Sequence, residues 1–260
     1  MNSVLRVENL SISFGGVAAV NDVSFRARKG EILSIIGPNG AGKTTLFNMI
    51  SGLNKPKSGR VLLGDTDVSG YEPFRLARLG LSRTFQNLQI FFRLSVIENV
   101  MIGRSRWERT NLLADLLGLP SVRRQNAETR QIAYQILERM GSAEQAELSA
   151  GNLSYGALKR LEIARALASE PMVLLLDEPA AGCNAVETEE IVQVIRSIAS
   201  SNVAIVLIEH DMKMVMRLSN HVVVLNEGRV LAEGPPEVVK NDPNVISAYL
   251  GTQRTEHVAS

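Results

Sequence analysis

Residues 37–45 read Gly37-Pro38-Asn39-Gly40-Ala41-Gly42-Lys43-Thr44-Thr45. An apolar run, residues 32–36, comes directly before them, and a helix-like segment, residues 46–50, follows. A strand, a loop with the spacing G-x-x-x-x-G-K-[ST] and a helix, in this order, are typical of a loop that cradles phosphates. Glycines let backbone N–H groups turn toward phosphate oxygens, and the start of a helix attracts the same anion. The sequence therefore predicts that the chain binds a nucleoside triphosphate.

We assign every residue of this loop to the bound nucleotide. Lys43 is predicted to reach the β- and γ-phosphates, and the Thr44 hydroxyl to coordinate Mg²⁺. The remaining positions are predicted to contact the phosphates or to shape the loop around them: Gly37, Pro38, Asn39, Gly40, Ala41, Gly42 and Thr45. The alternative is an ordinary corner between a strand and a helix, and the complete pattern in its expected context argues against it.

The composition is that of a globular protein. With 260 residues, 45% of them hydrophobic and 21% charged, the chain can form a full α/β core. A formal net charge of +1 gives no overall attraction to nucleic acid or to an anionic membrane. The single cysteine, Cys183, excludes a disulfide within the chain and indicates a reducing compartment. We expect no membrane-spanning segment and no signal peptide, because no apolar run approaches ~20 residues and the first residues lack the basic and apolar regions of a signal.

Two kinds of strand pattern are present. Apolar positions alternate with polar ones from Leu5 to Phe14, and residues 61–63 read as a further strand, which together predict a small antiparallel sheet. Continuous apolar runs are typical of parallel strands that helices cover on both faces. Three such runs occur in the second half of the chain: residues 172–176, 203–208 and 221–225.

Helical patterns dominate the middle of the chain. We predict a helical subdomain, about residues 87–160, a further helix over about residues 186–199 and a hairpin turn at residues 226–229. The predicted fold class is α/β: a P-loop NTPase core with a mainly parallel sheet, an N-terminal antiparallel β subdomain and the inserted helical subdomain. We treat residues 1–250 as a single domain and residues 251–260 as a polar C-terminal tail.

Three residues are predicted to carry the chemistry. Asp177 and Glu178 end the apolar run of residues 172–176, and ligands of α/β proteins lie at the carboxyl ends of parallel strands. Asp177 can hold Mg²⁺ directly or through water, and Glu178 can orient or deprotonate an attacking water. His210 follows the next apolar run and could hydrogen-bond the γ-phosphate, although a lone histidine is by itself a weak signal.

A second candidate anion site lies at Leu153-Ser154-Tyr155-Gly156. These residues open a helix that is predicted to run to about Ala168, with Ser154 as its N-cap. A capped helix start can bind an anion, although most such starts bind nothing. The residues alone leave both possibilities open.

These elements, in this order, resemble the ATP-binding subunit of an ABC transporter over about residues 4–250. Leu153-Ser154-Tyr155-Gly156 is similar to the family's signature motif, so the resemblance implies that Ser154 and Gly156 contact ATP. It also implies roles for further positions: adenine stacking for Phe14, sensing of the γ-phosphate and Mg²⁺ for Gln86, metal binding for Asp177, the D-loop for residues 181–184 and the switch histidine for His210.

A narrower resemblance concerns the subgroup that serves high-affinity uptake of branched-chain amino acids. It is carried by residues 77–87, 175–182 and 248–251, and the leucine-rich stretch 111–120 looks like that subgroup's longer helical insert. Lipopolysaccharide-export ATPases share much of the pattern but typically have a shorter helical region. Uptake systems for urea and short amides resemble it just as closely.

The resemblance implies a working dimer. In it, the Ser154–Gly156 helix start of one subunit closes the ATP site of the other, Glu178 positions water, and hydrolysis reopens the pair. The implied partners are a second ATP-binding subunit, identical or related, transmembrane permease subunits and, indirectly, a solute-binding protein, without nucleic acid. The implied location is the cytoplasmic face of the inner membrane, as a peripheral protein.

The chain departs from the family pattern at three positions. Ala157 stands where the family usually has Gln, and a methyl group cannot make the polar contacts of an amide. Cys183 and Ala185 stand where the subgroup usually has Leu and Pro. Because Ser154 and Gly156 remain, we expect activity to survive.

Two rival functions belong to other classes. A soluble ABC-type ATPase acting on nucleic acid or ribosomes usually has two cassettes or a long coiled-coil insertion, whereas this chain has one phosphate loop and no sustained heptads. A regulatory nucleotide binder without turnover would not need Glu178 and His210.

Overall fold

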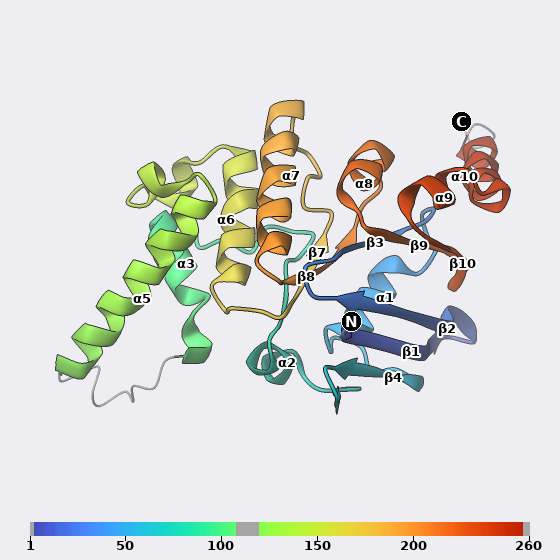
Figure 1. Cartoon of the computed structure of the whole chain (residues 1–260), viewed down its shortest axis with the longest axis horizontal. Helices are drawn as coiled ribbons and strands as arrows, with labels where there is room; N and C mark the ends of the chain where they lie inside the picture. Colours follow the sequence, from blue (N-terminus) through green and yellow to red (C-terminus); the bar gives the residue numbers. More distant parts are fainter. Residues whose placement is uncertain (1–2, 108–119, 257–260) are drawn as a thin grey trace. The chain divides into compact units, whose positions relative to one another are not determined.

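A computed structural model of the chain describes residues 3–107 and 120–256, with side chains described up to Tyr249 (Figure 1). The chain divides into two compact units. The first comprises residues 3–83, 172–178 and 198–256, and the second comprises residues 84–107, 120–171 and 179–197. Most of the leucine-rich stretch, residues 111–119, lies outside the described residues.

The first unit contains two sheets. The antiparallel sheet has the strand order β2-β1-β4-β5, and the larger sheet has the order β10-β9-β3-β8-β7-β6. The strands are β1 (Ser3–Phe14), β2 (Val17–Arg28), β3 (Ile32–Ile36), β4 (Ser58–Leu63), β5 (Thr66–Asp67), β6 (Leu81–Arg83), β7 (Val173–Asp177), β8 (Ala204–Ile208), β9 (His221–Asn226) and β10 (Arg229–Gly234). The larger sheet has five parallel strands, which are in spatial order β6, β7, β8, β3 and β9. Its sixth strand, β10, pairs antiparallel with β9.

The predicted fold class is confirmed by these sheets. The alternating pattern of residues 5–14 forms β1, and the continuous apolar runs form the parallel strands β7, β8 and β9. The hairpin predicted at residues 226–229 joins β9 to β10, with Glu227 and Gly228 at φ 48° and 77°. The sequence did not indicate β6, because three residues are too few for a period to be recognised.

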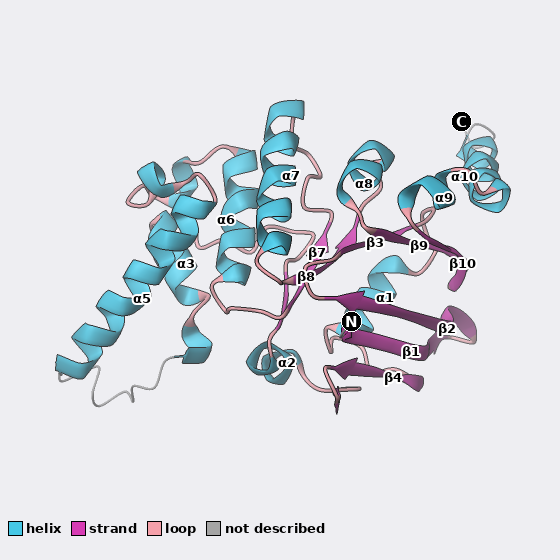
Figure 2. Cartoon of the chain, in the orientation of Figure 1, coloured by secondary structure: helices cyan, strands magenta, loops and turns pink. Residues whose placement is uncertain are grey.

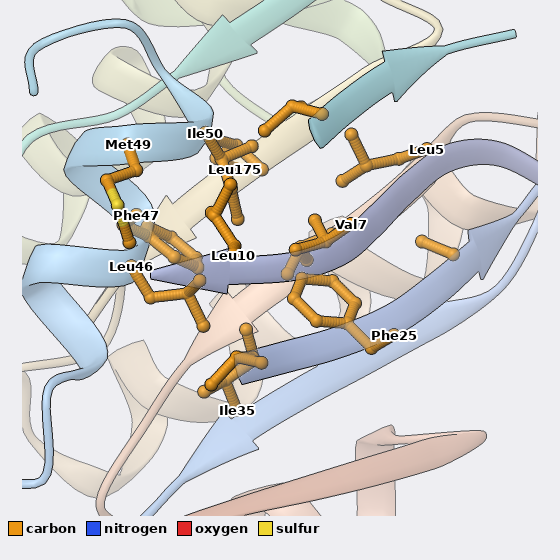
Figure 3. Close-up of a cluster of buried hydrophobic side chains, with 14 of the residues drawn as sticks. Leu5, Val7, Leu10, Phe25, Ile35, Leu46, Phe47, Met49, Ile50 and Leu175 are labelled. Carbon is orange, nitrogen blue, oxygen red and sulfur yellow. The ribbon is translucent and has the colours of Figure 1, made fainter. Parts of the chain in front are cut away.

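The main hydrophobic core of the first unit joins both sheets through α1 (Lys43–Ile50). Side chains from β1 and β2 of the antiparallel sheet and from β3 and β7 of the parallel sheet meet the buried residues of α1 (Figure 3). The central contacts are made by Leu5, Val7, Leu10, Phe25, Ile35, Leu46, Phe47, Met49, Ile50 and Leu175. Because four of the eight residues of α1 are buried, the phosphate loop that precedes it is held on a rigid element.

A second core lies on the other face of the parallel sheet. On β3, Ile35 belongs to the main core and the next residue, Ile36, to this second one, as the alternation of side chains along a strand requires. Val215, Val239 and Val245 belong to this core. They come from three helices that lie on one side of the larger sheet in Figure 2. These helices are α8 (Met212–Leu218), α9 (Pro236–Lys240) and α10 (Pro243–Glu256).

The predicted C-terminal tail is helical at its start, since α10 extends to Glu256; residues 257–260 lie outside the described residues. The first unit also holds α2 (Pro73–Leu79), which contacts β6 and contributes the buried Leu76 to the main core.

The second unit is helical. Its helices are α3 (Val96–Ile102), α5 (Pro120–Arg139), α6 (Tyr155–Leu167) and α7 (Ala185–Ser200), the last three residues of α7 belonging to the first unit. Contacts join α3 to both α5 and α6, and Arg160 of α6 pairs with Glu190 of α7. Along the described parts of the chain, no helix combines the length and the apolar character that crossing a bilayer requires.

Candidate nucleotide-binding site

The phosphate loop lies between β3 and α1 and depends on glycine at two positions. Gly37 and Gly42 have φ values of 151° and 99°, which other residues rarely adopt. A Cβ atom on Gly37 would lie 2.2 Å from the carbonyl oxygen of Leu225, and one on Gly42 would lie 2.3 Å from that of Ala19. Any side chain at either position would therefore displace the backbone that supports the loop.

The start of α1 is open to an anion. Gly42 is its N-cap, no side chain of the described residues caps it, and no acidic residue lies in its first turn. Lys43 folds back over the loop, where its Nζ donates to the carbonyl oxygens of Gly37 at 2.7 Å and Pro38 at 3.0 Å. Burial lowers the pKa of the Lys43 ammonium, while the carboxylates of Glu178 and Asp177 act in the opposite direction. A helix start without a side-chain cap and the Lys43 cation thus lie where the sequence predicts phosphate.

Asp177, at the end of β7, is held by a residue that the sequence reading did not single out. Arg83 Nη2 donates to Asp177 Oδ2 at 2.8 Å, with both side chains less than a tenth exposed. Arg83 Nη1 also donates to Asn48 Oδ1 at 2.7 Å and to Ser51 Oγ at 2.8 Å, at the far end of α1. The sequence pattern gave no signal for this pair, because Arg83 ends a strand of only three residues, Leu-Ser-Arg, in which no periodicity reveals burial.

Glu178 has an unusual backbone conformation. Its φ is 49°, a left-handed value that is uncommon for a residue with a side chain, and its N–H donates to the carbonyl of Ile208 at 3.0 Å. Such strain is found preferentially at functional sites. Its carboxylate Oε1 lies 3.8 Å from Nδ1 of His210, so the structure brings these two predicted residues together.

His210 is positioned by its neighbour. The imidazole is two-thirds exposed, whereas the side chain of Glu209 is buried and its Oε2 accepts from the His210 N–H at 3.1 Å. Glu209 was not predicted, because it directly follows the apolar strand β8, where the sequence does not distinguish a buried carboxylate from an exposed one. The first unit therefore gathers Lys43, Asp177, Glu178 and His210.

Phe14 is the last residue of β1, and its side chain is half exposed. An exposed aromatic ring at a strand end can receive a base by stacking. The stacking of Phe14 on adenine remains a prediction.

Gln86 lies in the second unit, in an exposed stretch directly after Phe85. The Phe85 N–H donates to Oε1 of Glu162 on α6 at 3.4 Å, and burial raises the pKa of Glu162. The segment that carries Gln86 is thereby tied to the helix that begins at the signature motif. Its sensing role stays a prediction.

The signature motif forms a capped helix start, as predicted. Ser154 is the N-cap of α6, and its Oγ accepts from the N–H of Ala157 at 3.3 Å. Ala157, which stands where the family usually has Gln, is buried. Gly156 donates its N–H to the carboxylate of Glu187, at the start of α7. The sequence reading did not identify Glu187.

Comparisons with known proteins agree on one family. The profile described as "ABC transporter" matches residues 20–181. The chain is 44% identical to the high-affinity branched-chain amino acid transport ATP-binding protein BraF of Pseudomonas aeruginosa and 46% identical to LivG of Escherichia coli, which carries the same description. Each alignment covers 95% of this chain and 98% of the relative. The chain belongs to the ABC transporter family.

As a member of this family, the chain is an ATP-hydrolysing subunit of an ABC transporter, and it binds nucleotide. A second profile, described as "Branched-chain amino acid ATP-binding cassette transporter", matches residues 229–254. Among solved structures, the chain resembles a nucleotide-free ATP-binding cassette of an ABC transporter, with a TM-score of 0.83 and 33% identity over 95% of this chain and 98% of the other. It also resembles the ADP conformation of MJ1267, an ATP-binding cassette of an ABC transporter, with a TM-score of 0.84 and 32% identity over 96% and 100%.

Proposed function

We propose that this chain is the ATPase of an importer for branched-chain amino acids. The supporting observation is its identity of 44–46% to BraF and LivG across nearly the whole of each chain, combined with the subgroup profile at residues 229–254. That support favours amino-acid uptake over lipopolysaccharide export and over a soluble ATPase that acts on nucleic acid. Urea and short amides are the nearest competing cargoes.

The catalytic proposal follows from the first unit. Glu178 orients water for in-line attack on the γ-phosphorus, and His210, 3.8 Å from its carboxylate, hydrogen-bonds the γ-phosphate. Lys43 neutralises charge on the β- and γ-phosphates while the amides at the start of α1 bind their oxygens. Phe14 stacks on the adenine.

The donor set of the site fits Mg²⁺. Magnesium prefers oxygen ligands and is usually bound through one or two carboxylates together with water and the substrate's phosphates. The Thr44 hydroxyl and the Asp177 carboxylate are such ligands, with Gln86 as the proposed third, and the described residues contain no cluster of three or more His, Cys, Asp or Glu that would hold a metal by itself. When bound, Mg²⁺ would offset the negative charge that builds up on the phosphates.

The assembly we propose has a second ATP-binding subunit, identical or related, whose ATP meets Ser154 and Gly156 of this chain. Gln86 and the residues after it pass the motion to transmembrane permease subunits, to which a solute-binding protein delivers cargo. The chain would then lie at the cytoplasmic face of the inner membrane. Residues 1–250 act as one ATPase domain in this proposal, with residues 87–160 as its helical subdomain.

The experiment is phosphate release and uptake by the complete transporter. Glu178→Gln should bind ATP normally and lower turnover by at least about 100-fold, since a general base contributes that much. Glu227→Gln is the matched control: it is also a glutamate in the left-handed region, at φ 48°, but lies exposed in a hairpin. Near-normal turnover of Glu178→Gln would remove Glu178 from catalysis.

Cargo is tested on the same complex in vesicles. ATP-dependent uptake of leucine, isoleucine or valine is expected, and it should stop with Glu178→Gln. Uptake of urea in place of these amino acids would leave the ATPase assignment intact but contradict the proposed cargo.

A further inference from the structure

The signature segment (residues 153–157) already carries an anion from its own chain. Glu187 Oε1 accepts from the N–H of Gly156 at 3.1 Å and from the Ser154 hydroxyl at 3.3 Å. These are the two groups that the proposed function assigns to a triphosphate bound by a second subunit. A carboxylate therefore occupies the donors intended for a phosphate.

The side chain of Glu187 also fills the space above Gly156. A Cβ atom built on Gly156 would lie 2.5 Å from both Cγ and Cδ of Glu187 and 2.7 Å from its Cβ. A phosphate oxygen cannot reach the same N–H while Glu187 stays there, because the two would overlap and would also repel as like charges. Binding of one anion requires departure of the other.

The second carboxylate oxygen of Glu187 binds the D-loop (residues 181–184). Oε2 accepts from the N–H of Asn184 at 3.1 Å, so one side chain bridges the signature segment and the D-loop. The two segments also touch at Gly182, where a Cβ atom would lie 3.0 Å from the Tyr155 ring. Displacing Glu187 from α6 therefore alters a contact of the D-loop.

Helix α7 can keep its cap when Glu187 moves. Asn184 Oδ1 accepts from the N–H groups of Val186 at 2.9 Å and Glu187 at 3.0 Å, independently of the Glu187 carboxylate. The amides of Asn184 and then Gly156 lower the pKa of Glu187, so the side chain is ionised at neutral pH. The carboxylate is an anion that can leave without unravelling its own helix.

We propose that Glu187 is a stand-in anion: it occupies the Gly156 N–H and the Ser154 hydroxyl until the γ-phosphate on a facing subunit displaces it. When it leaves, its contact with the D-loop changes as well, so the D-loop responds to the arrival of the phosphate. This inference rests on the proposed function, which supplies the facing phosphate. Glu187 thereby opposes dimer formation and sets the ATP concentration that dimer formation needs.

The test uses the full chain with Glu178→Gln, which is expected to lower turnover at least about 100-fold, alone and mixed with any second ATP-binding subunit that co-purifies with it. Association is followed by light scattering as ATP is added. Adding Glu187→Gln keeps the shape of the side chain but removes its charge, and hydrogen bonds to charged groups are roughly twice as strong as neutral ones. The ATP concentration for half-maximal association should fall by about fivefold or more.

Two matched variants complete the design. Glu189→Gln, two residues further along α7, removes a carboxylate that accepts from Gln193 at 2.8 Å and should leave the ATP midpoint unchanged. Ser154→Ala removes a hydroxyl that donates to Glu187 and would donate to the phosphate. It should weaken association, even though Glu187 also loses a hydrogen bond that holds it in place.

The outcomes separate the two proposals. An unchanged or raised ATP midpoint with Glu187→Gln, while Ser154→Ala still weakens association, would overturn the stand-in role and leave the proposed function standing. Absence of any ATP-dependent association in the Glu178→Gln background, alone and in the mixture, would contradict the proposed dimer itself. Melting temperatures of all variants show whether a loss arises from unfolding.

Discussion

Two helix starts in this chain are assigned to phosphate, and they are built in different ways. The start of α1 has a glycine cap, no capping side chain and no acidic residue in its first turn. The start of α6 has a serine cap, and the Glu187 carboxylate accepts from its Gly156 N–H and its Ser154 hydroxyl. The difference suggests that α1 is prepared to bind nucleotide at once, whereas α6 first has to release an internal anion.

A third helix start gives the ordinary case. At α3, Ser95 Oγ accepts from the Glu98 N–H at 3.2 Å, and Glu98 Oε2 accepts from the Ser95 N–H at 2.7 Å. This capping box stays within one helix. Glu187 forms the same kind of pairing with Asn184 and reaches a second helix as well. That additional reach distinguishes a stand-in anion from a cap.

The largest effect on ATP binding should come from the open start. Lys43→Ala removes the cation of the α1 site, and because a hydrogen bond to a charged group contributes ~1.5–3 kcal/mol, ATP affinity should fall about 10- to 100-fold. Equilibrium binding of a fluorescent ATP analogue measures this. Lys57→Ala, an exposed lysine beyond α1, is the control and should bind normally. Equal affinities for the two variants would contradict the phosphate assignment.

The next effect concerns the far end of α1, where Arg83 joins Asn48 and Ser51 to Asp177. Arg83→Met leaves the buried Asp177 carboxylate without this partner, and breaking a buried pair costs about 3–5 kcal/mol of unfolding free energy. Urea unfolding checks the value.

The structure offers a matched control for that experiment. Arg60 and Glu8 also lie 2.8 Å apart, but Arg60 is well exposed, and exposed pairs contribute only about 0–1 kcal/mol. Arg60→Met should therefore be nearly neutral. If both arginine variants lost the same stability, burial would not be what makes the Arg83 pair important.

The two helix starts differ in how much of their structure could be predicted from the sequence. The phosphate loop is local, so its strand, glycines and lysine could be recognised from residues 32–50 alone. The continuous apolar runs likewise predicted β7, β8 and β9, because fully buried strands leave a plain signal. Ser154 was recognised as a cap for the same local reason.

Contacts between residues that are far apart in the sequence were not predicted. Arg83 and Asp177 are 94 positions apart in the sequence, and Glu187 and Gly156 are 31 positions apart, so no periodicity or spacing connects the members of either pair. Glu187 lies three residues after Asn184, a spacing that is typical of a helix cap, but this spacing cannot reveal a second partner on another helix. Such contacts follow only from how the strands and helices pack.

The smallest effect sharpens the contrast between a cap and a stand-in anion. The Ser95 N–H, and then its hydroxyl, lower the pKa of Glu98. Because the folded pKa is depressed, the stability that Glu98 contributes is fully present above its ordinary unfolded pKa and is lost as pH falls through the lower folded value. Glu98→Gln should lower the unfolding free energy by about 0.3–1 kcal/mol at pH 7, and the difference should shrink toward zero in acid.

Urea unfolding of both proteins between pH 7 and pH 3 measures this difference, with Glu128→Gln in the middle of α5 as an exposed control. Because Glu98 caps only its own helix, Glu98→Gln should leave the ATP dependence of association unchanged, unlike Glu187→Gln. If Glu98→Gln also lowered the ATP midpoint, the effect of Glu187 would reflect loss of surface charge in general, and the distinction between the two helix starts would not hold.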